Sequence, residues 1–145
     1  MDWKREAADK LRKHEARKEA IRSIPEEIRM YEEAFNGIRS ASADSTPVAG
    51  GGSTREDMLL SNIVKREELG AALKQARRAV AIVDRGLEVL TEEERLILDR
   101  FYINPAKGNV ERLCGELGIE QSSAYRRRDA ALKHFTIALY GITES

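Results

Sequence analysis

The stretch LCGELGIEQSSAYRRRDAALKHF, residues 113–135, decides how the C-terminal part of the chain folds. Leu113 and Leu117 are spaced as on one face of a short helix. Gly118 follows, and glycine ends a helix in a left-handed conformation at the least steric cost. A second helix is predicted from about Gln121, with serine hydroxyls available to cap its first turn. Its apolar residues fall on one inward stripe, made of Ala124, Ala131, Leu132 and Phe135.

The outward face of this second helix is polar and basic. Two short helices joined by a tight turn indicate a helix-turn-helix, whose second helix enters the major groove of DNA with its N-terminal residues on base edges. Arginine can hold guanine through two hydrogen bonds, and serine or glutamine can reach neighbouring bases. The alternative is an ordinary helical hairpin with a basic, solvated face. The residues predicted to face the bases are Gln121, Ser122, Ser123, Tyr125, Arg126 and Arg127.

A further helix is expected just before this pair. Thr91 and Glu94 have the spacing of a capping box, which predicts a helix start at Thr91. Residues 103–108, INPAKG, contain a proline and a glycine and therefore predict a turn. Asn109 is the expected N-cap of the next helix. We expect Lys107, Asn109 and Lys133 to contact DNA phosphates.

Two segments, LTEEERLILDRFY (residues 90–102) and NVERLCGELGIEQSSAYRRRDAALKHF (residues 109–135), resemble region 4 of the sigma-70 family. The likeness covers residues 90–141. The chain is also similar to small phage-encoded late-gene transcription regulators of the ArpU/RinA type, which share a charged helical N-terminal half. The resemblance implies a phage or prophage transcription regulator that binds double-stranded DNA, either upstream of a promoter as a dimer or with region 4-like contacts to RNA polymerase.

The whole chain is expected to be all-α. Its predicted parts are N-terminal helices at 1–40, a flexible Gly/Ser linker at 41–54, a long coiled-coil-like helix at 55–90 and a helix-turn-helix domain at 91–145. Within the first part, Pro25 predicts a break near Ile24 and a new helix from Pro25. The glycine- and serine-rich composition of 41–54 buries too little surface to order itself.

The long helix carries an apolar stripe that alternates spacings of three and four residues. Such a stripe is typical of a coiled coil. It predicts a homodimer through the helical N-terminal half, an antiparallel hairpin within one chain, packed against residues 25–38, or both together in a helical bundle. The stripe consists of Arg66, Leu69, Leu73, Ala76, Val80, Val83, Leu87 and Leu90.

Composition limits the possible functions. Lys plus Arg and Asp plus Glu both number 25, so the net charge is zero and any DNA contact must be local. The single cysteine, Cys114, excludes a disulfide or a cysteine-based metal site within one chain. His14 and His134 form no ligand pair, and neighbouring glutamates diverge on a helix. We therefore expect no enzyme, no cofactor and no metal, in a cytoplasmic protein without a membrane partner.

Two other classes of protein fit the same pattern. A phage small terminase subunit also joins a helix-turn-helix to oligomerising helices, and it forms rings. A coiled-coil adaptor would use the C-terminal domain to bind protein, as the near-neutral charge of that domain allows. Mass in solution separates the ring from a dimer, and salt-sensitive DNA binding separates the regulator from the adaptor.

Overall fold

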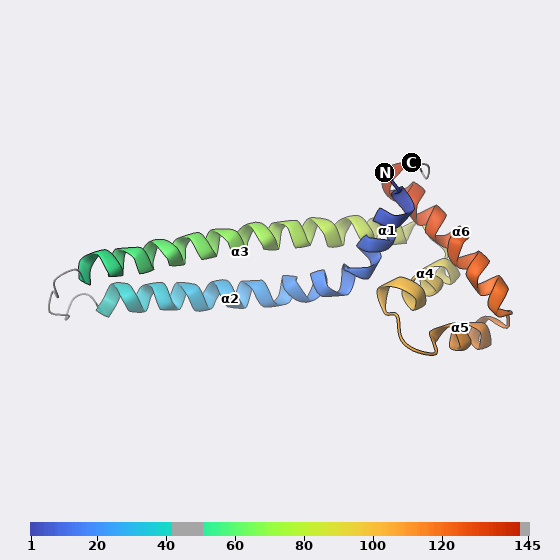
Figure 1. Cartoon of the computed structure of the whole chain (residues 1–145), viewed down its shortest axis with the longest axis horizontal. Coiled ribbons are helices and arrows are strands. Elements are labelled where there is room, and N and C mark those ends of the chain that lie inside the picture. Colours follow the sequence, from blue (N-terminus) through green and yellow to red (C-terminus); the bar gives the residue numbers. More distant parts are fainter. Residues whose placement is uncertain (42–50, 143–145) are drawn as a thin grey trace. The chain divides into compact units, whose positions relative to one another are not determined.

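Helices account for all the regular structure in the computed structural model, which describes residues 1–41 and 51–142, with the backbone alone at 51–53. The predicted all-α class is confirmed (Figure 1). The chain divides into two compact units, Glu19–Arg77 and Met1–Lys18 with Arg78–Ser145. The helices are α1 (Trp3–Arg12), α2 (His14–Ala41), α3 (Gly51–Glu88), α4 (Glu92–Leu98), the π-helical turn η1 (Asp99–Ile103), α5 (Asn109–Leu117) and α6 (Gln121–Tyr140).

The unit Glu19–Arg77, which we call the arm, is an antiparallel hairpin of α2 and α3 (Figure 1). Its seam contains a buried polar residue, Asn62, whose amide donates to the carbonyl of Tyr31 at 2.8 Å. The carbonyl of the same amide accepts from Arg66 at 2.9 Å. The ammonium of Lys65 lies 5.8 Å from the ring centroid of Tyr31. A satisfied polar residue in an apolar seam fixes the register of two helices, since any slip leaves it unpaired.

The apolar stripe of the long helix is covered within one chain. In α3, Ala76 and Val83 are buried, and Leu69 and Leu73 are half-buried. Within the arm the hairpin covers this stripe as far as Ala76, whereas Val83 and Leu90 belong to the core of the head. A contact between chains through the arm would therefore use another face of α3. None of the described helices combines the length and the apolar character that a bilayer crossing requires.

Two predicted boundaries differ from the structure. The break expected before Pro25 is wrong, because Pro25 lies inside α2. The chain bends at Lys13 instead, between α1 and α2. α1 packs its own buried face, Ala7, Ala8 and Leu11, against other helices, so tertiary packing rather than local sequence decides where the helix ends. Of the predicted linker, residues 42–50 lie outside the described part, and α3 already begins at Gly51.

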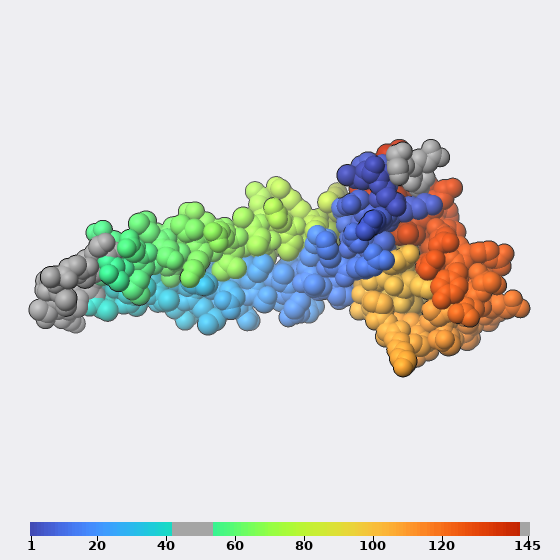
Figure 2. Space-filling view, in the orientation of Figure 1, coloured from blue at the N-terminus to red at the C-terminus, as the bar shows by residue number. Residues whose placement is uncertain are grey.

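The unit Met1–Lys18 with Arg78–Ser145, which we call the head, has one apolar core built from both ends of the chain. α1 packs against α6, which is visible as dark blue against red in Figure 2. The rings of Trp3 and Tyr140 lie 4.7 Å apart. The last turns of α3 add Val83 to the same core, and the turn that follows α3 adds Leu90. Its largest fully buried side chains are Phe135, Leu11, Ile97, Leu98, Leu113, Val83 and Thr136.

Local signals for the start of α4 are confirmed. The hydroxyl of Thr91 accepts from the backbone N–H of Glu94, and the carboxylate of Glu94 accepts from the N–H of Thr91, both at 3.1 Å. Arg95 donates to the carbonyls of Leu87 and Leu90 at 3.2 and 2.6 Å and so caps the preceding helix. This double cap separates α4 from the long α3.

Candidate nucleic-acid interface

The turn between α5 and α6 is short and is set by one glycine. Gly118 ends α5 with φ at 65°, as the sequence predicts. The backbone N–H of Ile119 returns to the carbonyl of Cys114 at 3.1 Å, and the side chain of Ile119 packs against the core. The capping residue of α6 is Glu120, and no side chain caps this helix. The prediction that a serine hydroxyl performs this role is therefore wrong, because Ser122 and Ser123 already lie within the first turn.

The inward stripe predicted for α6 is confirmed. Ala124, Ala131 and Phe135 are fully buried, and Leu132 is 8 % exposed. α6 contacts α1, α4 and α5. With this face buried, the first turns of α6 present most of their remaining side chains to solvent.

Ser122, Arg126 and Lys133 form one line on the outward side of α6, at spacings of four and seven residues. All three are exposed. Gln121 and Tyr125 are exposed beside this line, whereas Ser123 is half-buried. Arg126 has no ion-pair partner among the described residues, so its guanidinium is available to a ligand.

Two other basic residues of α6 contact acidic residues of α4. Arg127 forms an ion pair with Glu93, and His134 contacts Glu94. Burial of Glu94 favours its neutral form, but the hydrogen bond from the Thr91 backbone and the contact with His134 outweigh it, so the pKa of Glu94 is lowered. The basic outward face expected for α6 is thus partly neutralised by acidic residues distant in the chain.

Arg128 points back along the protein surface and stacks on two aromatic rings. Its guanidinium lies 5.2 Å from the ring centroid of Phe101 and 5.0 Å from that of Tyr125. The two rings lie 5.7 Å apart. The π-helical turn η1 places Phe101 here, in a position that spacing alone does not reveal. Stacking of this kind fixes the Tyr125 ring at the edge of the outward face.

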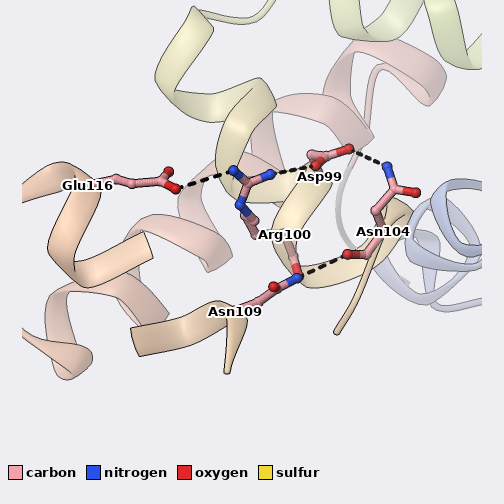
Figure 3. A network of polar contacts seen from close by, with 5 residues as sticks. All are labelled: Asp99, Arg100, Asn104, Asn109 and Glu116. Carbon is pink, nitrogen blue, oxygen red and sulfur yellow. Dashed lines mark hydrogen bonds and ion pairs between the residues drawn. The ribbon is translucent and has the colours of Figure 1, made fainter. Parts of the chain in front are cut away.

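A polar network ties η1 to α5 (Figure 3). Arg100 forms ion pairs with Asp99 at 3.0 Å and with Glu116 of α5 at 3.3 Å. The amide of Asn104 donates to the other carboxylate oxygen of Asp99 at 2.7 Å. The backbone N–H of Asn104 donates to the carbonyl of Asp99 at 2.8 Å, which closes the wide π-helical turn. This network holds the loop before α5 in place.

Asn109 belongs to the same network and does not face solvent. Its side-chain amide donates to the carbonyls of Arg100 and Asn104 at 3.1 and 3.0 Å, and only 7 % of the residue is exposed (Figure 3). The capping residue of α5 is Gly108, with φ at 84°. The predictions that Asn109 caps α5 and contacts a phosphate are therefore wrong, because both amide N–H groups are used inside the protein.

The phosphate contacts predicted for Lys107 and Lys133 involve exposed side chains. Lys107 lies in the loop directly before α5, whose N-terminus has no side-chain cap. Arg112, one turn into α5, is also exposed, and it has no ion-pair partner among the residues that the structure describes. Sequence reasoning missed Arg112, although its position three residues after Asn109 puts it near the start of the same helix.

Comparisons with known protein families, with curated proteins and with solved structures find no match to this chain.

Proposed function

We propose that the protein is a DNA-binding transcription regulator, of the kind encoded by phages and prophages, and that α6 reads the major groove. The observation that carries this proposal is the line of Ser122, Arg126 and Lys133 on the outward side of α6, beside an N-terminus that no side chain caps. Uncapped backbone N–H groups and a free guanidinium suit phosphates and guanine edges.

The contacts within the head support a choice among the basic residues that would bind DNA. Arg126 would contact bases, because it has no partner among the described residues. Arg127 would have to leave Glu93, and Arg128 would have to leave its two aromatic rings. Lys107 and Lys133 would take phosphates, and Arg112 would join them from α5. The few free cations imply modest non-specific affinity, which suits a protein that binds DNA as an oligomer or beside RNA polymerase.

The test is fluorescence anisotropy with DNA fragments from the phage genome that carries the gene, at two salt concentrations. Arg126→Ala should weaken binding to the preferred fragment at least tenfold, as expected for the loss of a bidentate contact to guanine. Arg127→Ala should weaken it less. Arg29→Ala in the arm is the matched control, because this exposed arginine lies far from α6 in sequence and belongs to the other unit.

A second variant tests the neutralisation directly. Glu93→Gln removes the partner of Arg127 and one negative charge, so DNA binding should strengthen and depend more steeply on salt. Equal affinity of wild type and Arg126→Ala would remove α6 as the reading helix.

A coiled-coil adaptor remains the second candidate, and the pairing of Arg127 and His134 with Glu93 and Glu94 favours it. An adaptor would show no salt-sensitive DNA binding even at low ionic strength. That result would redirect the search towards a protein partner of the head.

A further inference from the structure

The arm leaves a second apolar face of α3 uncovered. Met58 is 50 % exposed and Val64 is 49 % exposed, although the seam with α2 is already formed. They belong to a stripe that consists, in chain order, of Asp57, Met58, Ser61, Val64 and Lys65. The spacings of one, three, three and one residues place all five on one side of the helix. We call these five residues the outer stripe.

The outer stripe is self-complementary about Ser61. When two copies of a helix lie antiparallel around a two-fold axis at one residue, positions equally far before and after that residue face each other. Around Ser61, Asp57 of one copy faces Lys65 of the other, and Met58 faces Val64. Each of these contacts occurs twice because of the two-fold symmetry. The pairing places opposite charges against each other and apolar side chains against apolar side chains.

Neither charge of the outer stripe has an acid–base partner among the residues that the structure describes. The ammonium of Lys65 lies over the ring of Tyr31, and Asp57 has no ion pair within the same described part of the chain. The small side chain of Ser61 at the centre allows two helices to approach closely. Two unpaired, opposite charges placed symmetrically about a small residue favour a copy of the same helix as the partner.

The neighbouring face of α2 fits the same symmetry. A groove of about 390 Å³ between α2 and α3 is lined by Ala34 and Ser61, so these small residues lie beside each other along the hairpin. A two-fold axis at the level of Ala34 places Met30 of one copy, 61 % exposed, against Ile38 of the other. Both helices of the arm therefore share one axis.

We propose that the outer stripe of α3 pairs antiparallel with the outer stripe of a second copy of this chain. The two arms then form a four-helix bundle, with α3 against α3 and α2 against α2. This pairing concerns the arm alone and does not depend on DNA binding by α6. It gives the expected homodimer a defined surface, which differs from the stripe that the hairpin already buries.

A charge-swap experiment in sedimentation equilibrium tests the proposal with the full chain and no DNA. Asp57→Lys places lysines opposite each other in a pair of identical chains, and Lys65→Asp places aspartates opposite each other. Because each substitution changes both symmetric pairs, each variant alone should raise the dimer dissociation constant by roughly tenfold or more. The double variant, and an equimolar mixture of the two single variants, should recover dimers.

The controls separate this result from misfolding and from other assemblies. Glu67→Lys lies outside the outer stripe and should leave the dimer unchanged, and circular dichroism should give the same helix content for every variant. A monomeric wild type at high protein concentration, or a ring of many subunits, overturns the proposal. A dimer that neither single substitution weakens overturns it as well.

Cross-linking locates the axis. In a Cys114→Ser background, Ser61→Cys should form a disulfide-linked dimer quickly under mild oxidation, because the two residues meet at the axis. Gly70→Cys, which is exposed and far from Ser61 in the helix, should form it slowly. Equal rates for the two variants would contradict the register.

Discussion

His14 is a buried histidine at the start of α2, and its surroundings make the stability of the head depend on pH. It is 3 % exposed, and its Nε2 lies 3.2 Å from a carboxylate oxygen of Asp84. Burial lowers the pKa of His14 from its usual 6.5, and Lys18 lowers it further, whereas Asp84 and Glu15 oppose this shift without cancelling it. Folding therefore favours the neutral imidazole of His14 over its protonated form.

The sign of the pH effect follows from this lowered pKa. Below pH 6.5 the unfolded chain binds a proton at His14 before the folded chain does, so the free energy of unfolding falls as pH falls, until the native pKa is reached. Thermal unfolding followed by circular dichroism at several values between about pH 7.5 and pH 5 should show this loss. His14→Gln should flatten the slope in that window. An unchanged slope in the variant would assign the effect to another group.

Single residues also mark where sequence reasoning is reliable. The cap by Thr91 and the end of α5 at Gly118 were predictable, because the groups involved are neighbours in the chain. The inward orientation of the Asn109 side chain was not predictable, because the two carbonyls that accept from its amide are brought together only when η1 forms. The pairing of Arg127 with Glu93 joins residues far apart in sequence. The sequence alone therefore overstates the positive charge on the outward face of α6.

At the scale of elements, the head depends on a close approach between α3 and α6. A Cβ at Gly86 would lie 2.8 Å from the ring of Phe135 and 2.9 Å from a methyl group of Leu139. Sequence periodicity places Gly86 in a helix but gives no sign of this contact. The same limit explains Pro25: its local preference for a helix start yields to a continuous α2, while the bend moves to Lys13, where α1 packs on the core.

Gly86→Ala and Gly70→Ala form a matched pair in one helix. The first should destabilise the protein, because overpacking costs about 1–3 kcal/mol and outweighs the gain in helix propensity. The second has open space around the new methyl group and should stabilise by about 0.5–1 kcal/mol. Urea denaturation measures both changes. If both alanines stabilise equally, the helices do not approach as closely as described.

At the scale of the whole molecule, the head is built from both ends of the chain, whereas the arm is a continuous segment. α1 supplies Ala7, Ala8 and Leu11 to a core that otherwise comes from Arg78 onwards. The division into a helical N-terminal half and a separate DNA-binding domain, as the sequence suggested, therefore assigns α1 to the wrong neighbours. Ala7, Ala8 and Leu11 recur at helical spacing, but this spacing alone does not say which helix α1 packs against.

Leu11→Ala and Leu60→Ala make the same chemical change in different settings. Leu11 is fully buried, so its loss should lower the free energy of unfolding by about 2–5 kcal/mol. Leu60 is 61 % exposed and lies off the outer stripe, so its loss should change stability by no more than about 0.5 kcal/mol. Chemical denaturation of both variants would show whether α1 is an integral part of the head, and similar small losses would exclude it.

The contact between α1 and α6 also constrains how the protein is made. On a ribosome α1 emerges well before α6, the helix that covers it. The arm can close as soon as α3 has left the exit tunnel, while the apolar face of α1 waits for α6. During this interval the nascent chain exposes Ala7, Ala8 and Leu11 to chaperones.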